Sequence, residues 1–104
     1  MSSERIEELV EVLRSSVLGA PVRLAIMIYL LSRRKLYFSD LLAVIGTTPG
    51  NLWSHLKKLE EQRLVKIKRV FSNRPRTQIV ITELGISETL KFIRVLKELL
   101  KNAG

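Results

Sequence analysis

The chain has 104 residues, which is enough for one domain with a real core and too few for two. It has no cysteine and a single histidine, His55, which excludes disulfides, thiol chemistry and a zinc site built from these residue types. The formal net charge is +8, and the whole excess lies in residues 33–82, which hold eleven basic and three acidic groups. Such a segment favours a polyanionic partner, because each Lys or Arg that neutralises a phosphate releases a counterion; a merely solvated basic surface is the alternative.

The amino terminus is acidic and polar and lacks the apolar run of a secretion signal, and no segment approaches the ~20 apolar residues that span a bilayer. We therefore expect a cytoplasmic protein without membrane contact. Ser3 is predicted to cap a first helix with an apolar stripe, and Gly19 to end it. Pro21 then begins a second helix, to about Ser32, that is nearly all apolar and so predicted to be the buried one.

A helix-turn-helix pattern follows. Residues 36–38 suggest an extended run, Ser39 a cap for a third helix over 40–45, and Gly46 its end. Thr48 as cap and Pro49 at the first helical position predict a fourth helix to about Gln62. The tight turn between these two helices is typical of a helix-turn-helix motif, in which the second helix reads DNA.

The remaining pattern is a hairpin and a long helix. Strands are expected at residues 65–71 and 78–81, with a loop at 72–75 between them, and Thr82 is predicted to cap a last helix ending near Lys101. The fold class is therefore mainly α with a small β-hairpin (α+β). We expect one domain over residues 1–104: a DNA-binding core at 19–82, and terminal helices at 1–18 and 83–104 that form a dimer.

Three segments, at 38–42 (FSDLL), 48–60 (TPGNLWSHLKKLE) and 74–85 (RPRTQIVITELG), carry a resemblance. In this order and spacing they resemble the small archaeal winged helix-turn-helix regulators related to the MarR and ArsR families, over roughly residues 18–90. The resemblance implies a dimeric DNA-binding transcription regulator. The lack of cysteine departs from the metal-sensing members, and neither a metal nor another cofactor is expected.

Candidate DNA contacts come first from the fourth helix. Turning 100° per residue from Leu52 places its leucines on the core side and several small, polar or basic residues opposite. We expect Asn51 and Ser54 to contact bases, and the lysines, the two threonines and the free N–H groups of the helix start to hold phosphate. The candidates in this region are Thr47, Thr48, Gly50, Asn51, Ser54, His55, Lys57 and Lys58.

Three residues of this helix have two interpretations. Gly50 costs about 1 kcal/mol relative to Ala, so it indicates either close approach to DNA or tight packing on the preceding helix. Trp53 lies on a flank, where it either packs on the domain or touches a sugar. His55 has no partner for metal or triad chemistry, which leaves a structural or a phosphate-contacting role.

The hairpin tip gathers Arg69, Asn73, Arg74 and Arg76 into eight residues. Such a wing is expected to lie on flanking phosphates or to place an arginine in the adjacent minor groove; a solvated charge run is the alternative. The terminal helices carry more apolar surface than one small core needs, which predicts a two-fold dimer rather than a monomer. The predicted dimer residues are Ile6, Leu9, Val10, Leu13, Leu90, Ile93, Leu96 and Leu100.

These expectations combine into a homodimeric, sequence-specific regulator of transcription on double-stranded DNA. Repression is favoured over activation, because so small a chain shows no surface devoted to recruiting polymerase. An enzyme is excluded, since no phosphate loop, activated nucleophile or ligand cluster is present. Two alternatives stay open: a winged-helix protein-interaction module and a nonspecific architectural DNA binder. A small-molecule effector is not identified, and a pocket for one is expected between the terminal helices and the DNA-binding core.

Overall fold

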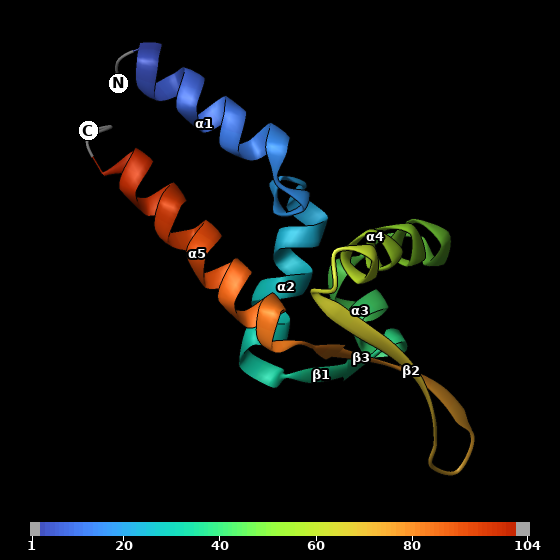
Figure 1. The fold of residues 1–104 in the computed structure, drawn as a ribbon. Coiled ribbons are helices and arrows are strands. Elements are labelled where there is room, and N and C mark those ends of the chain that lie inside the picture. Colours follow the sequence, from blue (N-terminus) through green and yellow to red (C-terminus); the bar gives the residue numbers. More distant parts are fainter. Residues whose placement is uncertain (1–2, 102–104) are drawn as a thin grey trace.

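The computed structural model describes residues 3–101 and shows a mostly helical chain with a three-stranded antiparallel sheet (Figure 1). In chain order the elements are α1 (Ser3–Ser15), a 3-10 turn η1 (Val17–Gly19), α2 (Pro21–Arg33), β1 (Lys35–Tyr37), α3 (Phe38–Ile45), α4 (Pro49–Glu61), β2 (Val65–Phe71), β3 (Pro75–Ile81) and α5 (Glu83–Leu100). This is the winged helix-turn-helix order, and the predicted fold class is confirmed.

The sheet contains one strand more than the predicted hairpin. Its order is β1-β3-β2, with Lys35 opposite Val80 at one edge. The predicted hairpin is present but longer than expected, because Phe71 pairs with Pro75 and only residues 72–74 remain in its loop. The returning strand therefore begins at Pro75 rather than at residue 78.

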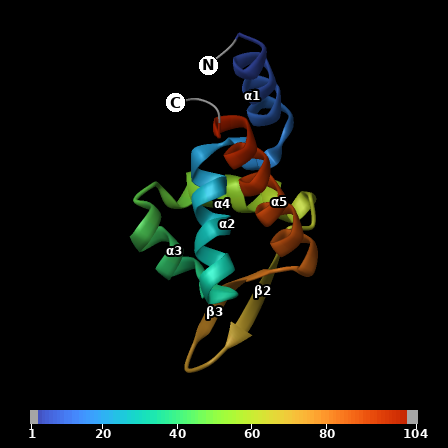
Figure 2. The ribbon, with the colours of Figure 1, turned by 90° about the vertical axis from the view of Figure 1, so that its left-hand side faces the viewer.

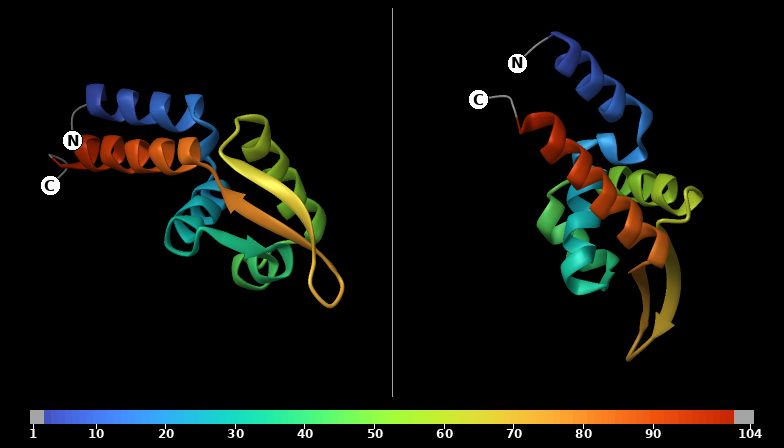
Figure 3. Two further views of the ribbon diagram at one scale, coloured as in Figure 1. Left: turned by 60° about the horizontal axis from the view of Figure 1, so that its bottom comes forward. Right: turned by 60° about the vertical axis from the view of Figure 1, so that its left-hand side comes forward.

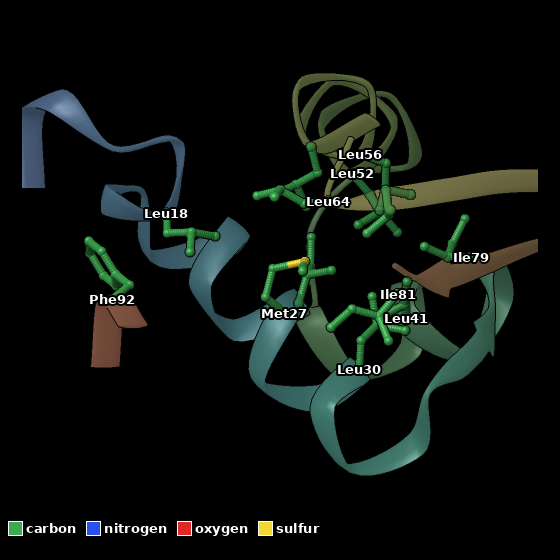
Figure 4. Close-up of a cluster of buried hydrophobic side chains, with 13 residues drawn as sticks. Leu18, Met27, Leu30, Leu41, Leu52, Leu56, Leu64, Ile79, Ile81 and Phe92 are labelled. Carbon is green, nitrogen blue, oxygen red and sulfur yellow. The ribbon is translucent and has the colours of Figure 1, made fainter. Parts of the chain in front are cut away.

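The core lies between one face of this sheet and the helices. α2 runs through the middle of the domain and crosses α4, with α3 on one side and α5 on the other (Figure 2). Ile26, Met27 and Leu30 of α2 are completely buried, which confirms α2 as the buried helix. Figure 4 shows leucines of α3 and α4 and isoleucines of β3 meeting them in one cluster.

The terminal helices extend away from the sheet. α1 and α5 lie side by side (Figure 3), which gives the molecule its length of 55 Å against 27 and 23 Å in the other directions. Phe92 and Leu99 of α5 are buried, whereas no described residue of α1 is fully buried. None of the helices within residues 3–101 combines the length and the apolar character needed to cross a membrane.

Three helix boundaries were predicted wrongly. Ser3 is not a cap but already helical. Gly19 does not end α1, which stops at Ser15; Gly19 lies in η1, where an added Cβ would fall 1.7 Å from the Leu13 carbonyl oxygen. Ser39 does not cap α3, because the helix begins at Phe38 and Asp40 accepts a hydrogen bond from the backbone N–H of Tyr37 (3.4 Å).

Candidate nucleic-acid interface

The turn between α3 and α4 has the geometry that the sequence predicts. Gly46 ends α3 with φ 70°, a left-handed conformation that glycine adopts without strain. Thr48 then caps α4: its hydroxyl accepts a hydrogen bond from the backbone N–H of Asn51 (3.2 Å), and Pro49 occupies the first turn. The short turn fixes how α4 leaves α3.

α4 has a buried and an open side. Leu52, Leu56 and Leu59 are completely buried, so the helix is held firmly by the core. The predicted DNA-facing residues lie on the other side: Gly50, Asn51, Ser54 and Lys58 are exposed and Lys57 is half-buried, while His55, on the flank, is half-buried beside Arg23. The structure thus brings the predicted residues of α4 onto one accessible surface.

At the start of α4, the side chain of Asn51 has a partner within the chain, whereas the space beside Gly50 is open. The Asn51 side-chain amide donates a hydrogen bond to the Thr47 hydroxyl (2.6 Å), which leaves its oxygen and its second N–H unoccupied. Gly50 has open space around it, since an added Cβ would meet no atom within 4 Å. The interpretation of Gly50 as a residue packed tightly on the preceding helix is therefore wrong, and contacts within the chain do not require a glycine there.

The two lysines of α4 differ in their surroundings. Lys57 forms an ion pair with Glu60 and lies 5.7 Å from the ring centre of Trp53. Trp53 itself packs edge-on against Phe38 (6.2 Å between centroids) yet remains 43% exposed, so it packs and also faces solvent. Lys58 is exposed, and within residues 3–101 no ion pair neutralises it. Of the two lysines, Lys58 is therefore the one available to bind a phosphate.

His55 has a partner that the sequence did not indicate. An Nη of Arg23 lies 3.1 Å from its Nδ1, while the Nε of the same arginine donates to the Val17 carbonyl oxygen (2.7 Å). Burial lowers the pKa of His55 from its ordinary value of 6.5, and the charges of Arg23 and Lys58 lower it further. The neutral ring accepts at Nδ1 and keeps its proton on Nε2, which is suited to donate to a phosphate.

The residues of the predicted wing do not form a single patch. Because Ile79 and Ile81 of β3 are buried, odd-numbered positions of the hairpin face the helices and even-numbered ones face outward. Arg69 faces the helix side and donates to the hydroxyl of Thr77 (3.0 Å). Arg76 faces outward, its guanidinium 3.5 Å from the ring centre of Tyr37. Asn73 and Arg74 are exposed in the loop between these faces.

The sheet is electropositive because its strands contain no acidic residue. Lys66 and Lys68 extend the basic surface outward from β2, and both are exposed. They were not among the predicted contacts, although their alternation with Val65 and Ile67 in the sequence already indicated a solvent-facing lysine pair. The described residues include no group of three His, Asp or Glu side chains that could hold a metal ion.

The predicted dimer residues on α1 and α5 are all exposed or half-buried. Five of them are 38–49% exposed: Ile6, Val10, Leu13, Leu90 and Leu100. Leu9, Ile93 and Leu96 are half-buried, and Leu96 packs against the core of its own chain. At the junction of these helices with the core is a cavity of about 260 Å³, lined by Ser15, Ser16, Val17, Leu18, Gln62, Leu64, Leu84 and Glu88.

Comparison with known proteins identifies the family. The family model described as a winged helix DNA-binding domain matches residues 22–100 of this chain. A solved transcriptional regulator homologue from Pyrococcus horikoshii OT3 is 47% identical, with a TM-score of 0.86 over 93% of this chain and 97% of that one. No curated protein matches the sequence.

More distant structures share the fold. Rv0081 of M. tuberculosis is 25% identical, with a TM-score of 0.69 over 98% of each chain. The S. aureus MepR protein in a complex with DNA is 18% identical, with a TM-score of 0.72 over 92% of this chain and 82% of that one. These distant likenesses show that the fold is shared. The chain therefore belongs to the winged helix DNA-binding family of transcriptional regulators.

Proposed function

We propose that the protein is a homodimeric repressor that binds a specific, approximately palindromic site on double-stranded DNA. α4 enters the major groove, and the wing, defined as residues 69–76, contacts the flanking backbone or minor groove. The observation that carries the proposal is the open side of α4, where Asn51 and Ser54 face solvent on a helix whose other side is core. A DNA complex of the structurally similar MepR supports DNA as the ligand.

Asn51 is the main candidate for base readout. Its hydrogen bond to Thr47 limits its rotation but leaves one acceptor and one donor free, the pair that an adenine edge requires. Ser54 lies one turn further along α4 and suits several base edges. Lys58, His55 and the capped start of α4 are assigned to phosphate contacts, which orient the helix without selecting a sequence.

The dimer is assigned to the terminal helices. Residues 19–82 form the DNA-binding core, and α1 and α5 leave apolar side chains exposed that a second copy would cover. A two-fold pair would present two α4 helices about 34 Å apart, or one turn of DNA. Repression then needs only that the bound dimer exclude polymerase from the site, and action on the chromosome implies a cytoplasmic protein.

The first experiment measures binding by fluorescence anisotropy across a salt series. Wild type and an Arg74→Ala/Arg76→Ala variant are titrated onto duplex DNA with and without random-sequence competitor. We expect a steep salt dependence for wild type that becomes shallower in the variant. If neither binds duplex DNA at low salt, the DNA-binding proposal fails and a winged-helix protein-interaction module replaces it.

A second experiment separates a specific regulator from a nonspecific architectural binder. Duplexes are selected from a random pool by wild type and by an Asn51→Ala/Ser54→Ala variant. A specific regulator enriches one palindromic site, and the variant loses the enrichment while keeping its salt dependence, because no charge is removed. Equal enrichment by both proteins, or none by either, would contradict base readout by α4.

The dimer is tested by sedimentation of Val10→Glu, with Val44→Glu as the matched control. Both valines are exposed, but Val10 lies on α1 among the proposed dimer residues and Val44 on α3. We expect the first variant to be monomeric and the second to remain dimeric. A monomeric wild type would refute the dimer.

A further inference from the structure

The wing carries an aromatic side chain that none of the proposed contacts uses. Phe71, the last residue of β2, is 81% exposed, compared with 62% for Val44, the next most exposed large apolar residue. The other large apolar residues that are strongly exposed lie on helices. Among the described residues, Phe71 is the one strongly exposed large apolar residue on the hairpin, whose tip projects away from α1 and α5 (Figure 1).

The ring lies on a defined side of the hairpin. Phe71 shares the face of Val65 and Ile67, which pack toward the helices, and its cross-strand neighbour on that face is Pro75. The hairpin extends beyond the helices that cover its base. The face that is buried at Val65 is therefore open to solvent at Phe71. Phe71 therefore lies on the same side of the sheet as α3 and α4.

The surroundings of this ring are cationic. Arg69 precedes it on the same face, held by its hydrogen bond to Thr77, and Arg74 follows in the loop. Neither the loop nor the strands contain an acidic residue. An apolar ring flanked by cations has the composition of a minor-groove wedge, in which the cations hold the phosphates while the apolar group enters a base step.

We infer that Phe71 inserts into a base step of the minor groove beside the site read by α4 and bends the DNA there. This inference rests on the proposed function. Insertion partly unstacks the step and kinks the duplex toward the major groove. Because pyrimidine–purine steps kink most easily, Phe71 would also add a preference for such steps without forming a hydrogen bond to any base.

The test compares Phe71→Ser, Phe71→Leu and Arg74→Ser on a duplex enriched by wild type from a random pool. Donor and acceptor dyes at its two ends report bending by energy transfer, and 2-aminopurine placed at successive steps reports unstacking. Wild type and Phe71→Leu should bend the duplex by about 20–90°, since leucine also acts as a wedge. Phe71→Ser should leave it straight with an unchanged salt dependence, because it removes no charge, whereas Arg74→Ser should lower the salt dependence.

Each other outcome overturns the inference. If Phe71→Ser and wild type both bind the duplex and bend it equally, Phe71 is not a wedge, and the proposed function is unaffected. A change of sedimentation in Phe71→Ser, with bending retained, assigns the ring to a protein contact instead. Absence of wild-type binding to any duplex overturns the proposed function and the wedge together. Thermal unfolding of each variant confirms that the fold is intact, which the exposure of Phe71 predicts.

Discussion

Replacing Arg74 by alanine isolates the electrostatic part of the wing. Arg74 is exposed in the loop between β2 and β3, and within residues 3–101 no acidic side chain pairs with it. The substitution therefore changes the folded domain little, and we expect the melting temperature to stay the same. Its whole effect should appear in DNA binding, through the loss of one phosphate contact from each protomer.

The size of that effect follows from counterion release. Each phosphate contact contributes about 0.9 to the slope of log affinity against log salt, so Arg74→Ala, which removes one contact from each protomer of the proposed dimer, should lower the slope by about 1.8. Between about 50 and 200 mM salt, wild type should then lose about 12-fold more affinity than the variant does. Anisotropy titrations at four or more salt concentrations resolve such a difference.

Arg76→Ala is the matched comparison. Its guanidinium stacks on Tyr37 on the outer face of the sheet, so the variant should lose about 0.5–1 kcal/mol of folding free energy and change the salt slope less than Arg74→Ala does. Identical salt slopes for wild type and Arg74→Ala would refute the assignment of the loop to the phosphate backbone. A larger slope change in Arg76→Ala would place the duplex on the outer face instead.

Four further substitutions test the framework behind the interface. Leu56→Ala removes a fully buried side chain of α4 and should cost 2–5 kcal/mol, measured by urea unfolding; a smaller loss would mean that α4 is not fixed by the core. Gly85→Ala should destabilise the fold by about 1–3 kcal/mol, because its Cβ would fall 2.1 Å from the Leu64 carbonyl oxygen. Gly50→Ala has open space around the new Cβ and should stabilise the fold by about 1 kcal/mol. A higher urea midpoint for Gly85→Ala than for Gly50→Ala would contradict this packing. Because His55 binds a proton more readily when unfolded, its contribution to stability is complete above pH 6.5 and is lost as the pH falls through the lowered pKa of the folded state. Melting temperatures over this range should show that loss in wild type and not in His55→Gln.

The local signals in the sequence were sufficient for the helix-turn-helix. Thr48 with Pro49 and Thr82 with Glu83 set the starts of α4 and α5 where predicted, because a cap is a contact between residues three apart. The ends of α2 and α4 carried no such signal. Arg34 and Arg63 take φ values of 70° and 61°, a conformation for which glycine is the usual residue.

Contacts between residues far apart in the sequence could not be predicted. Arg23 and His55 are 32 positions apart, and only the crossing of α2 and α4 brings them within 3.1 Å. Arg76 stacks on Tyr37 only because β1 joins the hairpin as a third strand, whereas this segment was predicted only as a short extended run. Strand alternation gives the face of Phe71, but its exposure depends on how far the hairpin extends past the core.

The two parts of the interface differ in how firmly they are held, and this difference suits the roles proposed for them. Base readout requires a side chain whose position is fixed, and Asn51 lies on a helix anchored by three buried leucines and is itself hydrogen-bonded to Thr47. A phosphate contact tolerates more freedom, since the backbone charge is spread evenly along the duplex, and Arg74 lies in an exposed three-residue loop. Substitutions on α4 should therefore change which sequence is bound, whereas substitutions of the wing cations should change how tightly any sequence is bound.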